Sequence, residues 1–130
     1  MPEPTSRQSA GPTPSQPIQS FRAFYPYYMS QHQDATTRLL HVVGTVLFIA
    51  LVVFAIITAR PLLVLAGVFV AYFFAWIGHV AFERNRPATF RYPLYSVLAD
   101  FRMSAEILTG SRRLRERMPA GPDDNRPAPE

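Results

Sequence analysis

The residues of this 130-residue chain best suited to chemistry are its three histidines, His32, His41 and His79. His41 and His79 each lie nineteen positions from Arg60, on opposite sides of it. If the chain reverses at Arg60 between two antiparallel helices, equal distance from the turn means equal depth, about 28 Å from it. Both imidazoles would then meet at the open end of a helical hairpin, where they could bind a metal ion together.

A carboxylate and an arginine accompany these histidines. Glu83 is four positions after His79, so a helix would place both side chains on one face. Arg38 lies at nearly the depth of Glu83, which makes an Arg38–Glu83 ion pair the alternative to a metal-binding Glu83. His32 is nine positions before His41, on the opposite side of any continuous helix. It can join the other histidines only if the helix begins after it and the preceding connection folds back.

Several kinds of site are open to such a cluster. Neutral imidazoles with a carboxylate and free coordination positions are typical of non-haem Fe(II) sites that carry out oxygen chemistry. Zinc suits the same ligand types, with water as the fourth ligand. The histidines could instead hydrogen-bond one another, the backbone or lipid headgroups, and a bis-histidine haem between His41 and His79 would need a dimer to make room. The chain has no cysteine, which excludes disulfides and thiolate metal sites.

Two apolar runs, residues 42–59 and 61–82, must position these side chains. As helices they would be about 27 and 33 Å long, against roughly 30 Å of bilayer hydrocarbon. Arg60, followed by a helix-starting proline, is a turn signal between them. We therefore predict transmembrane helices over residues 35–59 and 61–83, with an aspartate capping the first.

Apolar residues at helical spacing predict two further helices, over residues 18–31 and 93–109. Both are amphipathic and suited to the membrane surface rather than to crossing it. Residues 1–17 and 111–130 are rich in proline and polar residues, and we expect them to be disordered. The predicted fold is an all-α membrane protein, in which a two-helix transmembrane hairpin and two flanking interfacial helices form one membrane domain over residues 18–110.

Charge distribution predicts the orientation. The chain has thirteen arginines, no lysine and nine acidic residues, for a net charge of +4. No nucleic-acid-binding motif accompanies this charge, and membrane topology explains the arginines better. They flank the open end of the hairpin, whereas Arg60 stands alone at its tip, so both termini are expected to be cytoplasmic. Because residues 1–17 contain no apolar core, we expect no signal peptide, and the first apolar run would direct insertion itself. Small residues such as Gly44 allow close packing within a chain or in a homo-oligomer.

The segments QHQDATTRLLHVVGT and WIGHVAFERNRPATF resemble a small membrane family. Its characterised fungal member is an Fe(II)-dependent 2-hydroxy fatty acid dioxygenase of the endoplasmic reticulum, which acts in phytosphingosine breakdown. The resemblance covers roughly residues 32–89, and FRYPLYSVLADFRM is similar to a bacterial subgroup, which implies the bacterial inner membrane. It implies that His32, His41 and His79 bind iron. It also implies that O2 cleaves the C1–C2 bond of a 2-hydroxy fatty acid, without an added organic cofactor.

The resemblance implies further roles. A 2-hydroxy acid can chelate iron through its carboxylate and hydroxyl while its alkyl chain stays in lipid, and Arg38 or Arg86 could hold the carboxylate. The family is described with more than three histidines, so Glu83, or less favourably Asp100, would complete the ligand set. We therefore predict a membrane-embedded non-haem iron oxygenase that uses a fatty acyl substrate and O2. The alternative is a non-catalytic membrane protein that organises lipid or a partner.

Overall fold

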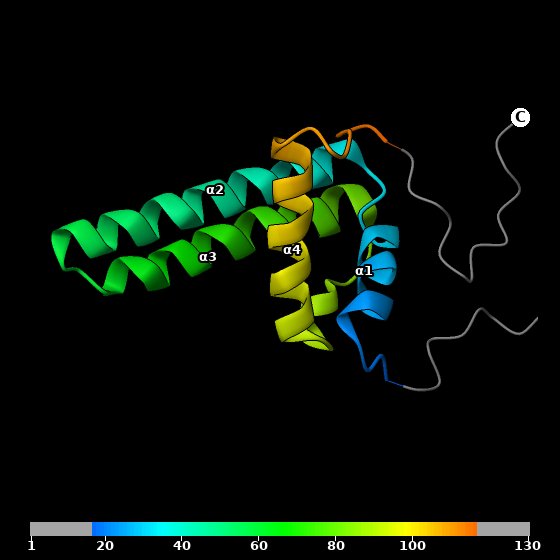
Figure 1. Cartoon of the computed structure of the whole chain (residues 1–130), viewed down its shortest axis with the longest axis horizontal. Coiled ribbons are helices and arrows are strands. Elements are labelled where there is room, and N and C mark those ends of the chain that lie inside the picture. The colour runs from blue at the N-terminus through cyan, green and yellow to red at the C-terminus, as the bar shows by residue number, and fades with distance from the viewer. Residues whose placement is uncertain (1–16, 117–130) are drawn as a thin grey trace, which may run out of the picture.

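A computed structural model of the chain describes residues 17–116, and within them it contains only helices and turns (Figure 1). The elements in chain order are α1 (Phe21–Ser30), α2 (Ala35–Thr58), α3 (Leu62–Ile77), the π-helical turn η1 (Gly78–Glu83), the 3-10 turn η2 (Ala88–Phe90) and α4 (Pro93–Leu108). The predicted all-α class, with two long apolar helices and two shorter helices, is confirmed. The predicted disorder of residues 1–16 and 117–130 lies outside the described residues.

Helices α2 and α3, with η1 continuing α3, run antiparallel and form a rod (Figure 1). At its tip Ala59 adopts a left-handed conformation with φ of 53°, and the Arg60 N–H donates to the Ala55 carbonyl oxygen at 2.9 Å. These features end α2 where the sequence predicts the reversal. At the other end of α2, the Asp34 carboxylate accepts a hydrogen bond from the Thr36 N–H at 2.7 Å, so Asp34 is the N-cap.

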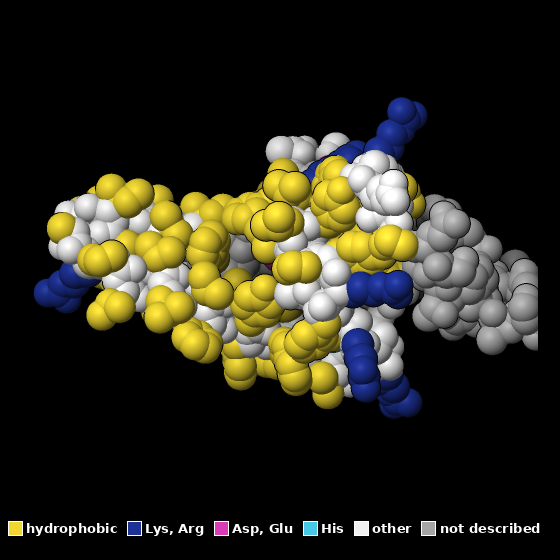
Figure 2. All heavy atoms as spheres, turned by 90° about the horizontal axis from the view of Figure 1, so that it is seen from below, with side chains coloured by type: hydrophobic (Ala, Val, Ile, Leu, Met, Phe, Trp, Pro, Cys, Tyr) yellow, Lys and Arg dark blue, Asp and Glu magenta, His cyan; other side chains and the backbone are white. Residues whose placement is uncertain are grey.

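The surface of the rod is apolar. Both α2 and the continuous helix of α3 and η1 are long and apolar enough to cross a membrane, yet only 28% and 17% of their most apolar windows are buried in the protein. Figure 2 shows hydrophobic side chains along the rod, with arginines near its two ends on this face. A core helix of a soluble protein would be mostly buried, whereas these two helices expose most of their apolar surface.

Helix α4 crosses the rod at a steep angle (Figure 1). Ala99 and Met103 pack into the protein core, but a second apolar side of the helix faces away from the protein. Leu94, Leu98 and Leu108 are each more than half exposed. Ser96 and Ser104, in contrast, are buried. A helix on the surface of a soluble protein has the opposite arrangement. The outer face of α4 therefore adds to the exposed apolar surface of the rod.

Helix α1 supplies the main protein core rather than a face directed at headgroups. Its aromatic side packs on α4 and η2 in a buried cluster made of Phe24, Tyr25, Tyr28, Met29, Ala88, Tyr92, Ala99 and Met103. Ser20 caps α1 by accepting from the Ala23 N–H at 3.1 Å, so the helix begins after the predicted position 18. Pro26 lies inside α1 without dividing it into two helices. The high density of aromatic residues thus reflects packing between helices.

Residues 111–116 also differ from the prediction of a disordered tail that begins at residue 111. They form turns that return toward the start of α2. There the Arg38 guanidinium donates to the Leu114 carbonyl oxygen at 3.0 Å and to the Glu116 carbonyl oxygen. This part of the C-terminal segment therefore covers the end of the rod where the histidines lie.

Candidate metal centre

The three histidines converge at the open end of the rod, which we call the base. His41 lies on α2, His79 lies in η1, and His32 lies in the connection between α1 and α2. Their ring centroids are separated by 4.6 Å for His32 and His41, 4.6 Å for His32 and His79, and 5.3 Å for His41 and His79. All three are buried, and one nitrogen from each lies within 4.8 Å of the others. The predicted meeting of His41 and His79, and the return of His32 over them, are confirmed.

Hydrogen bonds fix the tautomers of His32 and His79. The Nδ1 of His32 lies 2.6 Å from the Tyr28 carbonyl oxygen, which can only accept, so this nitrogen carries the proton. The Nδ1 of His79 lies 2.6 Å from Asn85 Oδ1. The amide of Asn85 is oriented because its Nδ2 donates to the carbonyl and side-chain oxygens of Gln31, each at 3.1 Å. In both histidines the unprotonated nitrogen is therefore Nε2.

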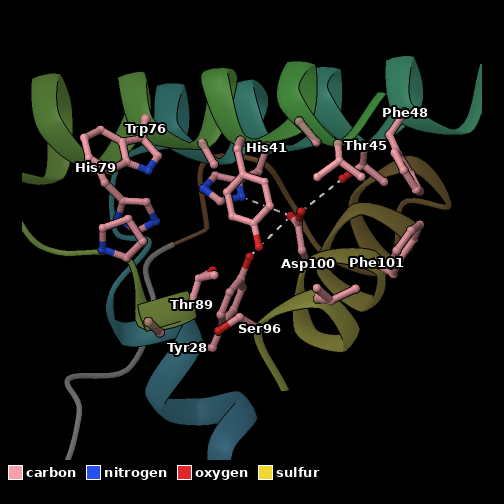
Figure 3. Close-up of a pocket in the computed structure, with 17 residues that line it drawn as sticks. Tyr28, His41, Thr45, Phe48, Trp76, His79, Thr89, Ser96, Asp100 and Phe101 are labelled. Atoms are coloured by element: carbon pink, nitrogen blue, oxygen red, sulfur yellow. Dashed lines mark hydrogen bonds and ion pairs between the residues drawn. The ribbon is translucent and has the colours of Figure 1, made fainter. Parts of the chain in front are cut away.

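A carboxylate orients His41 in the same way. Asp100, on α4, accepts from His41 Nδ1 at 3.0 Å, and from the hydroxyls of Tyr28 and Thr45 at 3.3 Å each (Figure 3). The sequence suggested Asp100 as a less favoured metal ligand. The structure instead places it behind His41, in the arrangement by which carboxylates orient metal-binding histidines and increase their basicity. This carboxylate is also anchored by two hydroxyls, so it holds the ring firmly.

The three Nε2 atoms consequently face one another without protons. His32 Nε2 and His41 Nε2 are 3.2 Å apart, and with both Nδ1 atoms protonated no hydrogen remains to join them. Burial lowers the pKa of His32 well below its usual range, and the neighbouring His41 and His79 lower it further, so that ring is neutral. Converging lone pairs of neutral imidazoles are the donor set of a divalent transition-metal ion. The donor set therefore fits a metal ion.

The other predicted site residues near the histidines have different partners. Glu83 accepts a hydrogen bond from the Asp34 N–H at 2.7 Å and is not in the histidine cluster. Arg38 is fully buried and donates to the carbonyl oxygens of His32 at 2.7 Å and Gln33 at 3.2 Å, besides the two in the C-terminal segment. Among the described residues no Arg38–Glu83 ion pair is formed. Arg38 thus fixes the connection that carries His32.

An elongated pocket of about 240 Å³ opens beside the histidines, between the rod and α4 (Figure 3). His41 and His79 contribute to its wall. Much of the remaining wall is apolar and includes Phe48, Val68, Ala71, Trp76, Val97 and Phe101. Neither Arg38 nor the exposed Arg86 lines it, so the structure does not bring the two predicted carboxylate-binding arginines into this space. The histidine cluster is closed by protein on the His32 side and open toward an apolar cavity.

This arrangement limits the chemistry. Three neutral imidazoles would leave the charge of a divalent ion uncompensated except by Asp100, and free coordination positions would face the pocket. An anionic ligand with two oxygen donors would balance that charge, and an apolar chain attached to it would occupy the rest of the cavity. The site is thus suited to an amphipathic acid.

A family model described as "2-hydroxy-palmitic acid dioxygenase Mpo1-like" matches residues 18–112. The match covers most of the chain and includes the three histidines and Asp100. The chain belongs to this family. Comparison with curated proteins and with solved structures gives no match. The family name indicates a dioxygenase-related role, and the three histidines could bind a metal ion.

Sequence reasoning missed the groups that orient the histidines. Asn85 reaches His79 only because Arg84 adopts a left-handed conformation with φ of 55°, which turns the chain back after η1. No spacing rule predicts that reversal. Asp100 did carry a signal, because it and Ser96 are four residues apart and so fall on one face of the predicted helix.

Proposed function

We propose that this protein is a membrane-embedded non-haem iron oxygenase that acts on 2-hydroxy fatty acids. The observation that carries the proposal is the convergence of three Nε2 atoms, each anchored through Nδ1, beside an apolar pocket. Iron is favoured over zinc by the family's description as a dioxygenase and by the coordination positions that three ligands leave free for substrate and O2. When bound, the metal would coordinate the hydroxy acid and activate O2.

The residues of the chain would perform the remaining tasks. His32, His41 and His79 would hold the metal, and Asp100 would keep the proton on Nδ1 of His41. The apolar wall would take the alkyl chain and exclude water. One 2-hydroxy acid and one O2 would give the acid one carbon shorter, CO2 and water. The four electrons that reduce O2 would come from C1 and C2 of the substrate, so no organic cofactor is required.

An oxygen-consumption experiment tests this function. The protein is purified without oxygen, placed in lipid nanodiscs, loaded with Fe(II) and given 2-hydroxypalmitic acid. We expect one O2 to be consumed for each shortened acid formed, whereas palmitic acid should not react because it lacks the hydroxyl that completes the chelate. Zinc-loaded protein is the control and should be inactive. Iron-loaded protein that consumes no O2 with the hydroxy acid would contradict the proposal.

We further propose that Arg60 lies at the bilayer face opposite both termini, and that these are cytoplasmic in a bacterial inner membrane. Phe48 contacts Phe101 of α4, and the twelve residues from Phe48 to Arg60 extend only about 18 Å. Because the hydrocarbon is roughly 30 Å thick, α4 and the pocket would lie within the cytoplasmic leaflet, on the side of the two termini. The chain has no cysteine, so an Arg60→Cys variant can be labelled selectively. Labelling of intact cells by an impermeant reagent is expected, and labelling only from the cytoplasm would contradict this topology.

A further inference from the structure

A buried hydroxyl in the pocket is not used by any interaction described above. Ser96 is 4% exposed, and its Oγ has no hydrogen-bond partner in the part of the chain that the structure describes. It lies on α4 one turn before Asp100 and lines the same pocket as His41 and His79 (Figure 3). An unpaired buried hydroxyl is costly, so a native protein usually provides it with a partner. Here a bound ligand can supply that partner.

Two more hydroxyls face the pocket from other elements. Thr89 of η2 and Tyr72 of α3 both line it, and within residues 17–116 neither side-chain oxygen has a hydrogen-bond partner. The carboxylate of Asp100 already accepts from three donors and does not engage them. Three elements therefore contribute hydroxyl-bearing residues to a cavity whose other walls are largely apolar. No arginine among residues 17–116 lines this cavity.

We propose that Ser96 binds the carboxylate of the fatty acid, with Thr89 and Tyr72 completing a polar subsite for the head of the ligand. This inference rests on the proposed function, because it takes the ligand to be an amphipathic acid. A carboxylate needs hydrogen-bond donors when it leaves water, and in a pocket without arginine these neutral hydroxyls are suitable donors. Recognition by hydroxyls replaces the arginine fork that the sequence suggested for Arg38 or Arg86.

The chain provides a matched control for Ser96. Ser104 lies two turns later on the same helix, is 2% exposed, and likewise has no hydrogen-bond partner among the described residues, but it does not line the pocket. Ser96→Ala and Ser104→Ala each remove one unpaired buried hydroxyl. A loss of ligand affinity confined to Ser96→Ala would therefore reflect binding rather than folding.

Trp76, the only tryptophan, lines the pocket and can report binding. Zinc-loaded protein in nanodiscs is titrated with palmitic acid, 2-hydroxypalmitic acid and hexadecanol while the fluorescence of Trp76 is followed. Because a hydrogen bond to a charged group is lost, Ser96→Ala should weaken the binding of both acids by roughly tenfold. It should change the binding of hexadecanol much less, and Ser104→Ala should change neither.

Equal affinity of the wild type and Ser96→Ala for both acids would overturn the inference. A loss confined to 2-hydroxypalmitic acid would also overturn it, because Ser96 would then recognise the hydroxyl rather than the carboxylate. Acid binding that depends on Ser96, in iron-loaded protein that consumes no O2, would leave the subsite standing and contradict the oxygenase function. If the wild type binds neither acid, both proposals fail.

Discussion

The two ends of the rod are built from the same pair of helices but differ in what they bury. In the outer rod, residues 49–67, only Thr58 and Arg60 are polar, and only Ala55 and Gly67 are buried. The Thr58 hydroxyl donates to the Phe54 carbonyl oxygen of its own helix at 2.7 Å. The base buries three imidazoles and an arginine and receives α1, α4 and the C-terminal segment as covering elements. The outer rod is suited to lipid, and the base buries polar side chains beneath these covering elements.

The difference shows where specificity arises. Two apolar helices can bring His41 and His79 level with each other, but they cannot decide which nitrogen of each ring carries the proton. That decision comes from groups outside the two long helices: Tyr28 on α1, Asn85 after η1, and Asp100 on α4. The short helices are therefore part of the site rather than anchors beside it.

The largest effect is expected when the charge behind His41 is removed. Asp100→Asn keeps the size of the side chain but loses the negative charge and its preference for an Nδ1 proton. We expect metal affinity, measured by competition with a chelator, to fall by about 10–100-fold. Thr58→Val, in the outer rod, is the control and should leave affinity unchanged. If both variants bind metal as the wild type does, Asp100 does not orient His41.

A methyl group at the base should destabilise the protein more than one in the outer rod. A Cβ at Gly78 would lie 2.8 Å from Thr37 Cγ2 and 3.3 Å from Thr37 Cα, in a buried position. A Cβ at Gly67 would meet Phe48 Cδ2 at 3.0 Å, on a partly exposed ring that can move. We expect Gly78→Ala to lower the free energy of unfolding by about 1–3 kcal/mol and Gly67→Ala by less. Unfolding in mixed micelles measures the free energy of unfolding of both variants. A larger loss for Gly67→Ala than for Gly78→Ala would contradict the packing described.

The Glu83→Gln variant tests whether Glu83 binds the metal or only accepts a hydrogen bond beside the histidine cluster. Because Glu83 accepts from the Asp34 N–H, and a glutamine oxygen can still accept there, metal content should remain that of the wild type. The loss of stability should be within about 1 kcal/mol, the order of one hydrogen bond. Metal analysis of the purified variant is the measurement. A proportional loss of metal would make Glu83 a ligand and show that the carboxylate moves into the cluster.

The smallest effect concerns Glu106, at the edge of the base. Burial raises its pKa, but hydrogen bonds from Arg112, Tyr25 and Arg102 outweigh burial, so the pKa lies below the ordinary 4.5. The carboxylate therefore adds stability above pH 4.5, and this stability is lost as the pH falls through the folded-state value. We expect the contribution of this carboxylate to the free energy of unfolding to be about 1 kcal/mol or less. The free energies of unfolding of the wild type and Glu106→Gln should therefore converge as the pH is lowered. A difference that does not change with pH would contradict this prediction.

Much of the fold and the histidine pair could be predicted because both depend on length and symmetry. Two apolar runs around Arg60 define the hairpin, and equal distances from Arg60 place His41 and His79 at one depth. Glu83 was assigned to the face of His79 by α-helical spacing. The structure has a π-helical turn there, whose i to i+5 hydrogen bonds change the angle between residues. Periodicity also cannot tell which side of α4 faces protein, since in lipid the apolar side can face outward.

The central claim is that three Nδ1-anchored histidines form a metal site at the base. The most direct test is the metal content of protein purified without oxygen from iron-supplied cells, compared with that of His41→Ala and His79→Ala. We predict close to one iron per chain in the wild type and almost none in either variant, with helix content unchanged by circular dichroism. A well-folded wild type without stoichiometric metal, or variants that retain it, would contradict the account.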